Sequence, residues 1–356
     1  MSQTWMLYGA NGYSGQLIAE LAVQRGEKPI LAGRNANAIY AMADRLGCEA
    51  RVLDLGNEST LVDSLADIKL VLNCAGPFSE TARPLLAACL QSHTHYLDLS
   101  GELAVFEHCY HQHERAFRQG TLICPGVALD VVPTESIALK LKQLMPNATQ
   151  LKLGFDGKMA LSPGSTLTLL SGIGDPELTL FMVRENGELK KAARPVMQKL
   201  AFAAGGRKRM AMSLTWADLN AAWYSTGIEN IAVFVRASWF NRLSFNYFQM
   251  ISGMLRKPVI QRMSEKAVKR LVKGPSVPDI ENSTMHVFGE ASNEKGETRR
   301  IDLTVPHGYK FTALSALAYV QFALSCSDKA GYFTPAQLTG PDFVQRIPGC
   351  SSFLVS

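Results

Sequence analysis

The sequence lacks the features of a membrane or secreted protein. No apolar run approaches the roughly 20 residues that a membrane-spanning helix needs. Residues 1–8 have neither the basic segment nor the long apolar core of a signal peptide. The seven cysteines are odd in number and include no Cys-x-x-Cys pair. We therefore expect a cytoplasmic protein with reduced thiols.

The sequence also lacks an extreme of charge. It has 36 Lys and Arg against 31 Asp and Glu, a net charge of +5. This mild excess does not indicate a nucleic-acid binder, which concentrates basic side chains on one face. At 356 residues the chain is too long for one typical domain and suits two.

The histidines lack the spacing of a metal site. Five of the seven lie between positions 93 and 113, including a His-x-His pair. At helical spacing, the side chains of His108, His111 and His113 do not point toward one common site. No second set of residues with the spacing of metal ligands follows. We therefore predict that the protein holds no metal.

What the sequence does contain is a glycine-rich turn between an apolar run, 4–8, and an amphipathic run, 17–23. Strand, glycine turn and helix form the arrangement that binds a dinucleotide pyrophosphate. Gly9 permits the tight turn, Gly12 lets backbone amides approach phosphate, and Gly15 lets the helix pack closely on the strand. The alternative is an ordinary glycine turn.

The next strand, 28–34, ends in Arg34, 19 residues after Gly15. An acid at this position would bind the ribose 2′-hydroxyl of NAD, whereas a guanidinium suits the 2′-phosphate of NADP. We therefore predict NADP(H); the alternative is that Arg34 is only an exposed strand end. Asp54 and Leu55, after the third strand, are predicted to border the adenine.

Strands and helices continue to alternate up to residue 124, which indicates a parallel sheet. A buried strand ends at Asn73, and the turn that follows would lie beside the phosphates and the nicotinamide ribose. The residues predicted to contact the cofactor are Gly9, Asn11, Gly12, Tyr13, Ser14, Gly15, Arg34, Asp54, Leu55, Cys74, Ala75, Gly76, Pro77, Phe78 and Gly126.

Acidic residues after the fifth strand are the candidates for catalysis. Alternation places Tyr96 and Asp98 on the same side of this strand, and Glu102 follows. We predict Asp98 and Glu102 as acid/base or substrate-positioning groups, with Tyr96 as a neutral donor. The alternative is that Glu102 stabilises the N-terminus of the next helix, with Asp98 or Ser100 as its cap. Asp130, after the sixth strand, is expected near the nicotinamide or at the start of the helix that follows.

Several motifs resemble the saccharopine dehydrogenase-like reductases, in particular the branch that includes the trans-acting enoyl reductases. They are Gly-Ala-Asn-Gly-Tyr-Ser-Gly (9–15), Leu-Ala-Gly-Arg (31–34), Asn-Cys-Ala-Gly-Pro-Phe (73–78), Tyr-Leu-Asp-Leu-Ser-Gly-Glu (96–102), Pro-Gly-Val-Ala-Leu-Asp (125–130), Ser-Pro-Gly-Ser (162–165) and Ser-Thr-Gly (225–227). The short-chain dehydrogenases share the glycine spacing, but no tyrosine here is followed four residues later by lysine, so their catalytic pair is missing.

The resemblance implies an α/β fold: a Rossmann-type doubly wound parallel sheet, then a second α+β domain inserted before a C-terminal helix that returns to the first domain. The expected bounds are 1–130 for the NADP-binding domain, 131–310 for the substrate or dimerisation domain, and 311–356 for the returning segment. Within the second domain, 216–234 has a strand-like pattern. The resemblance does not imply a substrate.

Residues 238–273 combine aromatic side chains with a basic stretch. We expect a helical insertion that packs on the domain or on a second subunit of a homodimer. The alternative is a peripheral contact with a membrane surface or with a fatty chain.

The pattern as a whole predicts an NADP(H)-dependent oxidoreductase that reduces a C=C, C=O or C=N bond of an apolar or acyl-type small molecule. The alternative is a catalytically silent NADP-binding scaffold or membrane-surface adaptor.

Overall fold

The computed structural model describes residues 4–157, 166, 181–192, 194–237, 267–268, 271–272, 274–326 and 328–356. These residues form two compact units. Unit 1 comprises Met1–Val132 and Tyr309–Pro348, and unit 2 comprises Pro133–Gly308 and Gly349–Ser356.

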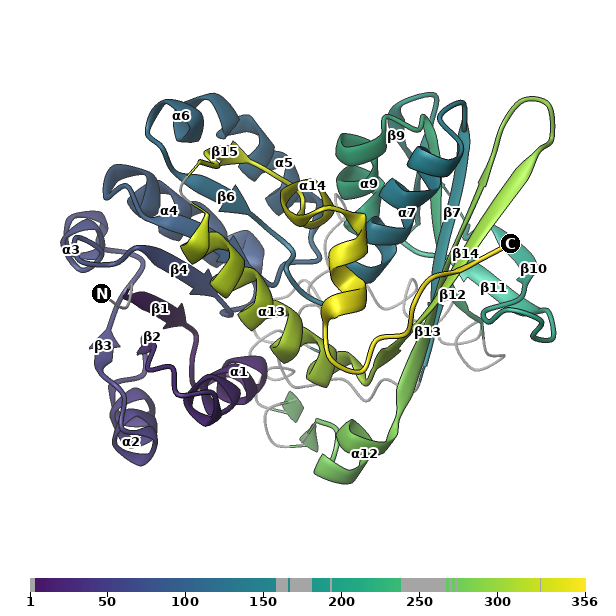
Figure 1. Cartoon of the computed structure of the whole chain (residues 1–356). Helices are drawn as coiled ribbons and strands as arrows, with labels where there is room; N and C mark the ends of the chain where they lie inside the picture. The colour runs from purple at the N-terminus through teal and green to yellow at the C-terminus, as the bar shows by residue number, and fades with distance from the viewer. Residues whose placement is uncertain are drawn as a thin grey trace. The chain divides into compact units, whose positions relative to one another are not determined.

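Unit 1 contains a parallel sheet of seven strands in the order β15-β6-β5-β4-β1-β2-β3 (Figure 1). The strands are β1 (Trp5–Tyr8), β2 (Ile30–Gly33), β3 (Ala50–Val52), β4 (Leu70–Asn73), β5 (His95–Asp98), β6 (Leu122–Cys124) and β15 (Gly331–Tyr332). The chain leaves β1 toward β2 on one side, whereas β4 pairs with β1 on the other. Open α/β sheets bind their ligands at such a switch point, outside the carboxyl ends of the strands. The predicted doubly wound fold is therefore confirmed.

Unit 1 also contains helices, most of which connect its parallel strands. They are α1 (Tyr13–Gln24), α2 (Ala36–Leu46), α3 (Glu58–Asp63), α4 (Phe78–Gln91), α5 (Leu103–His111), α6 (His113–Arg118), α13 (Gly308–Ser325), α14 (Pro335–Thr339) and the 3-10 helix η1 (Pro341–Arg346). The bounds of α2 follow from its caps, because the Asn35 side chain accepts the Ala38 N–H (3.2 Å) and Gly47 adopts the left-handed conformation. Helices α5 and α6 follow each other directly and are separated only by Gln112.

The C-terminal segment completes unit 1. Helix α13 runs beside α1 in the same direction: the rings of Tyr13 and Tyr309 meet at 4.8 Å near their starts, and Gln321 donates to Glu27 (2.6 Å) near their ends. Strand β15 then adds to the sheet beside β6. The last residues do not stay in this unit, because 349–356 belong to unit 2.

Unit 2 contains a mixed sheet of nine strands in the order β10-β11-β12-β7-β13-β14-β16, with β8 and β9 attached at β12. The strands are β7 (Gln150–Asp156), β8 (Met182–Glu185), β9 (Glu188–Lys191), β10 (Met197–Leu200), β11 (Arg209–Ser213), β12 (Asn230–Arg236), β13 (Thr284–Ser292), β14 (Thr298–Pro306) and β16 (Leu354–Val355). Strands β7 and β12 pair in parallel and the other pairs are antiparallel. This mixed sheet confirms the expected second α+β domain.

The described helices of unit 2 are α7 (Val132–Leu144), α9 (Asp218–Thr226) and α12 (Val277–Asn282). Helix α7 packs on the sheet at Gly289, where a Cβ would collide with Ile137. The strand-like interpretation of 216–234 is wrong over its first half, which is α9. Gly227 ends that helix in the left-handed conformation, and only 230–236 form a strand.

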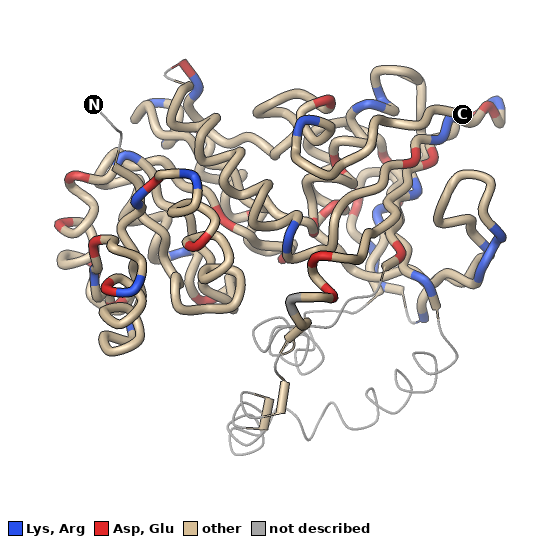
Figure 2. Tube along the Cα trace, turned by 60° about the horizontal axis from the view of Figure 1, so that its bottom comes forward, with Lys and Arg blue, Asp and Glu red and all other residues tan. Residues whose placement is uncertain are grey.

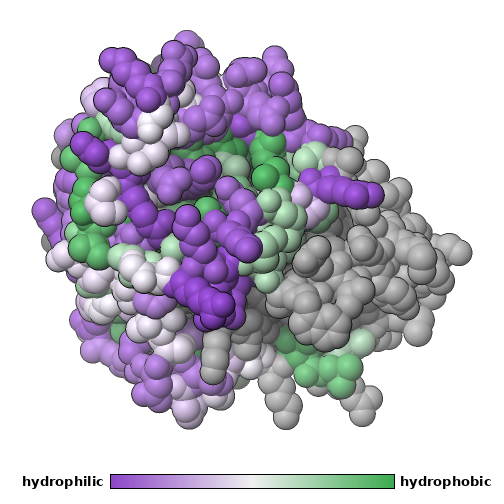
Figure 3. Space-filling model, turned by 90° about the vertical axis from the view of Figure 1, so that its right-hand side faces the viewer, coloured by the Kyte–Doolittle hydropathy of each residue, from purple (hydrophilic) through white to green (hydrophobic). Residues whose placement is uncertain are grey.

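Polar residues dominate the described surface. Basic and acidic residues are interspersed over the described chain (Figure 2). The face on the side of β10, β11 and the β13–β14 hairpin is mostly hydrophilic, with a smaller apolar area (Figure 3). Among the described residues, no helix is both long and apolar enough to cross a membrane. The Ser-Pro-Gly-Ser motif (162–165) lies outside the described residues, and so does the predicted insertion apart from 267–268 and 271–272.

Candidate functional site

The glycine turn has the geometry that its spacing predicts. Gly9 has a φ of +80°, and a Cβ there would lie 2.7 Å from the Ala75 backbone nitrogen. At Gly15 a Cβ would overlap the Gly9 carbonyl oxygen. Gly12 differs: it is exposed, and a Cβ would meet only the Gly9 oxygen, at 3.2 Å. The first and third glycines are therefore required by the fold, whereas the second leaves open space on the solvent side.

The N-terminus of α1 is suited to an anion. Its N-cap is Gly12, no side chain caps it, and its first turn contains no acid. The first N–H groups of a helix have no intrahelical partner, and the helix dipole favours negative charge there. Together with the open space at Gly12, this terminus fits the pyrophosphate of a dinucleotide.

Three polar side chains lie at or just after the carboxyl ends of β1, β2 and β3: Tyr8, Arg34 and Asp54. Burial raises the pKa of the Tyr8 phenol, the charge of Arg34 lowers it, and the charge of Asp54 raises it. Arg34 and Asp54 are exposed, and Asp54 accepts the Gly56 N–H (3.0 Å). This is the end of the site at which the 2′-phosphate and the adenine are predicted to bind.

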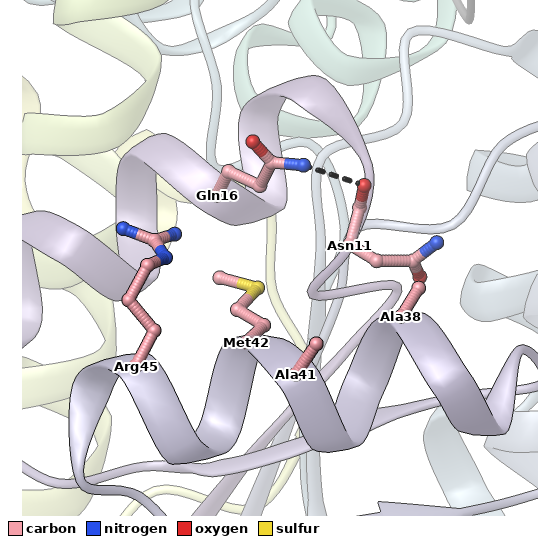
Figure 4. A pocket seen from close by; sticks show the side chains of 6 residues that line it. All are labelled: Asn11, Gln16, Ala38, Ala41, Met42 and Arg45. Atoms are coloured by element: carbon pink, nitrogen blue, oxygen red, sulfur yellow. Dashed lines mark hydrogen bonds between the residues drawn. The ribbon is translucent and has the colours of Figure 1, made fainter.

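A shallow pocket of about 320 Å³ opens between α1 and α2 (Figure 4). It is lined by Asn11, Gln16, Ala38, Ala41, Met42 and Arg45. Gln16 Nε2 donates to the Asn11 carbonyl oxygen (2.9 Å) and braces the glycine turn. The pocket flanks the Arg34 end of the site, since none of its lining residues follows β4, β5 or β6.

The turn after β4 is held from both sides. Asn73 Oδ1 accepts the Ala75 N–H (3.0 Å), and the Thr81 hydroxyl donates to the Ala75 carbonyl oxygen (2.5 Å). Asn73 Nδ2 also donates to Thr81 Oγ1 (3.2 Å). Because Ala75 lies directly against Gly9, this turn forms one wall of the glycine turn. Of the residues predicted here, Cys74, Ala75, Pro77 and Phe78 are half-buried and Gly76 is exposed.

Tyr96 and Asp98 lie in the interior, contrary to the expectation that they face a substrate. Both are fully buried. The Tyr96 hydroxyl accepts from Asn73 Nδ2 (3.2 Å) and donates to Asp98 Oδ2 (3.0 Å). Asp98 Oδ1 accepts the N–H groups of Ser100 (2.9 Å) and Gly126 (2.8 Å). These contacts link the ends of β4, β5 and β6, and they account for both side chains without contact to a substrate.

Glu102 also bonds to the fold. Its Oε1 accepts the Phe78 N–H (2.9 Å) and its Oε2 accepts the Ser79 N–H (2.8 Å). Burial raises the pKa of this carboxyl and the two N–H groups lower it. The alternative role of stabilising a helix N-terminus describes it better than direct acid/base work, but the helix is α4 rather than α5.

Gly126 and Asp130 follow β6 at the same edge. Gly126 has a φ of +74°, and a Cβ there would collide with Phe106. The Asp130 carboxylate lies against Gly101, where a Cβ would be 3.1 Å from Oδ2. Asp130 is half-buried, and burial raises its pKa to about 6. Asp130 is therefore a partly exposed acid at this edge, and the pKa of its carboxyl is raised toward neutral pH.

Sequence reasoning missed two kinds of residue. Asn73 and Thr81 hold the turn after β4, and the polar Asn73 at the end of an apolar strand was a usable signal. Tyr309 lies against Tyr13 at the start of α1, and no signal links positions 296 residues apart.

The clustered histidines serve the fold. His95 Nδ1 accepts the Leu122 N–H (3.1 Å), and burial lowers its pKa to about 4. His113 Nδ1 lies 3.1 Å from the Tyr332 N–H, which donates to it. In the part of the chain that the structure describes, no group of three or more His, Cys, Asp or Glu side chains could hold a metal ion.

This geometry is that of a Rossmann domain with an exposed arginine, Arg34, directly after β2. Residues 5–124 match the family model of the saccharopine dehydrogenase NADP binding domain. The resemblance drawn from the motifs is thus confirmed over this part of the chain, and the cofactor is NADP(H).

Two curated relatives share this region. A trans-acting enoyl reductase of Mycobacterium ulcerans is 32% identical over 138 residues, 36% of this chain and 33% of that protein. The trans-acting enoyl reductase of Mycobacterium leprae is 35% identical over a segment of the same length, again 36% and 33%. The match thus spans about a third of the length of these relatives.

One solved structure matches the whole chain. It is the apo histidine-tagged saccharopine dehydrogenase (L-Glu forming) from Saccharomyces cerevisiae, with a TM-score of 0.65 and 12% sequence identity. The match covers 100% of this chain and 99% of that one. At this identity the likeness shows a shared fold.

Proposed function

We propose that the protein is an NADP(H)-dependent reductase that acts on a C=C, C=O or C=N bond of an apolar or acyl-type small molecule. The observation that carries the proposal is one sheet edge with an open glycine turn in the middle, Arg34 on one side and the half-buried Asp130 on the other. The relatives named trans-acting enoyl reductase support an acyl-type substrate.

Different groups along this edge would bind different parts of the cofactor. Arg34 would bind the 2′-phosphate, and the N-terminus of α1 would bind the pyrophosphate. The cofactor, when bound, supplies the hydride, so that the protein needs chiefly to position it and to manage one proton. Asp130 would hold that proton in place of Asp98, because Asp130 is only half-buried whereas Asp98 is fully buried.

The pH dependence follows from the raised pKa of Asp130. With a pKa of about 6, its carboxyl carries a proton below that pH and is about one-tenth protonated at pH 7. Substrate reduction should therefore slow as the pH rises through 6, and the reverse oxidation should accelerate. Asp130→Asn should remove this limb of the pH profile.

Single-turnover oxidation of NADPH tests the proposal. The protein is mixed with NADPH and a panel of enoyl, keto and imine compounds, and the near-ultraviolet absorbance of NADPH is followed. Oxidation with one class would identify the bond that is reduced. A flat trace with every compound, despite tight NADPH binding, would instead favour a catalytically silent NADP-binding scaffold.

A further inference from the structure

We infer that Glu102 is a positioning residue for the nicotinamide half of the dinucleotide and acts through the turn between β4 and α4. The inference rests on the proposed function, because it presupposes that NADP(H) binds at this edge. The observation behind it is the Glu102 carboxylate, which holds the first two backbone N–H groups of α4.

The residue that caps the N-terminus of α4 is distant from that helix in the sequence. The N-cap residue of α4 is Pro77, which provides no side-chain hydrogen bond. Glu102, 24 residues after Phe78, provides both oxygens instead, at 2.9 and 2.8 Å. A carboxylate in this position satisfies two N–H groups that the helix leaves unpaired and complements the helix dipole.

The cap also makes α4 different from α1. Both helices begin at the carboxyl edge of the sheet, after the adjacent strands β4 and β1. The start of α1 has no cap from a side chain, whereas a negative charge already occupies the start of α4. A phosphate is therefore directed to α1, and α4 serves as a wall beside it.

A chain of contacts links the start of α4 to the glycine turn. Thr81, in the first turn of α4, holds the carbonyl group of Ala75, and Ala75 touches Gly9. Glu102 is anchored in turn, because its N–H donates to Ser100 Oγ (3.1 Å). Release of the start of α4 would therefore loosen the wall that faces the middle and the nicotinamide half of the cofactor, and it would leave the Arg34 end unchanged.

Two ligands and three variants test this assignment. NADPH spans the whole edge, whereas adenosine 2′-monophosphate reaches only the Arg34 end, and calorimetry gives a Kd for each. We expect Glu102→Ala to raise the Kd for NADPH about tenfold, which corresponds to about 1.4 kcal/mol, and to leave that for adenosine 2′-monophosphate unchanged. Glu102→Gln keeps one acceptor oxygen and should restore part of the affinity.

Glu80→Gln is the matched control. Glu80 is an exposed acid in the same first turn of α4, so that its loss removes a charge but not the cap. It should change neither Kd. If Glu102→Ala does not fold, Glu102→Gln serves as the test. It should bind NADPH more weakly and adenosine 2′-monophosphate with unchanged affinity.

The outcomes separate the two proposals. Equal weakening of both ligands, or unchanged NADPH affinity, would overturn the role of Glu102 and leave the proposed function standing. No binding of either ligand to the unmodified protein would overturn the proposed function, and this inference with it.

Discussion

The two ends of the sheet edge in unit 1 are built differently. At the ends of β2 and β3, exposed charged side chains, Arg34 and Asp54, face solvent. At the ends of β4 and β5, the polar side chains are buried and bond to one another, as in the series Asn73, Tyr96 and Asp98. Recognition of a ligand needs groups that can exchange water for ligand, whereas fixed loops need groups whose hydrogen bonds are already complete.

The difference has a consequence for mutations. A change at the Arg34 end should alter the affinity for the cofactor with little effect on folding. A change at the Asp98 end should alter folding first, because each lost partner leaves a buried donor or acceptor unsatisfied.

The largest expected effect is on stability at the buried end. Asp98→Ala leaves the Tyr96 hydroxyl and the N–H groups of Ser100 and Gly126 without their acceptor. We expect the free energy of unfolding to fall by about 3 kcal/mol or more, measured by urea denaturation with the buried Trp5 as a fluorescent reporter. Asp54→Ala, the control at the exposed end, should cost less than about 1 kcal/mol. Similar losses for the two variants would refute the contrast.

The next effect is on cofactor choice at the exposed end. Arg34→Ala should weaken NADPH binding by about 1.5–3 kcal/mol, the range for hydrogen bonds to a charged group, and leave NADH binding and stability nearly unchanged. Titration of each dinucleotide with fluorescence detection measures both. Arg25→Ala, which removes an exposed arginine at the C-terminal end of α1, opposite the glycine turn, is the matched control. Equal affinities of the unmodified protein for NADPH and NADH would contradict the role of Arg34.

Gly12 lies between the two ends of the sheet edge. Its substitution should weaken the binding of NADPH and NADH alike. Gly12→Ala places a methyl group in the open space at the start of α1, with only one neighbour at 3.2 Å and without an unfavourable φ. The fold should persist, while NADPH and NADH should each bind about 1.5 kcal/mol more weakly, as if one hydrogen bond to the pyrophosphate were lost. The same titrations test this. A loss confined to NADPH would show that the methyl group acts at the 2′-phosphate instead.

The sequence was most informative where the structure depends on neighbours in the chain. Asn35 and Gly47 define α2, and the three glycines define the turn after β1, because caps and tight turns are decided by local conformation. Arg34 was found for the same reason, since it ends a strand at a fixed distance from the turn.

The sequence was less informative about residues whose hydrogen-bond partners are distant in the chain. Alternation correctly put Tyr96 and Asp98 on one side of β5, but it could not tell whether that side is open or covered by α4 and α5. The partners of Glu102 lie on α4, and no periodicity relates them. The strand-like pattern over 216–234 was similarly limited, because residues Asp218–Thr226 form α9 in the folded protein.

The smallest expected effect is a pH dependence of stability from the buried end. Burial raises the pKa of Asp98 to about 6, against the opposing effect of the Ser100, Gly126 and Tyr96 hydrogen bonds. The folded state therefore holds this proton more tightly than the unfolded state does, so that this stabilisation is present at low pH and is lost as the pH rises through 6. Between pH 5 and 6, the free energy of unfolding should fall by about 1 kcal/mol more in the unmodified protein than in Asp98→Asn.

Asp130 provides the control for this measurement, because burial gives its carboxyl a similar pKa, about 6, at a position that reaches the surface. Because each carboxyl contributes separately to the pH dependence, Asp130→Asn should keep the part that Asp98→Asn removes and lose a part of its own. Urea denaturation of the three proteins at pH 5 and 6 compares the slopes. If Asp98→Asn keeps the full slope, then the hydrogen bonds around Asp98 offset its burial, and the carboxylate stays ionised at both pH values.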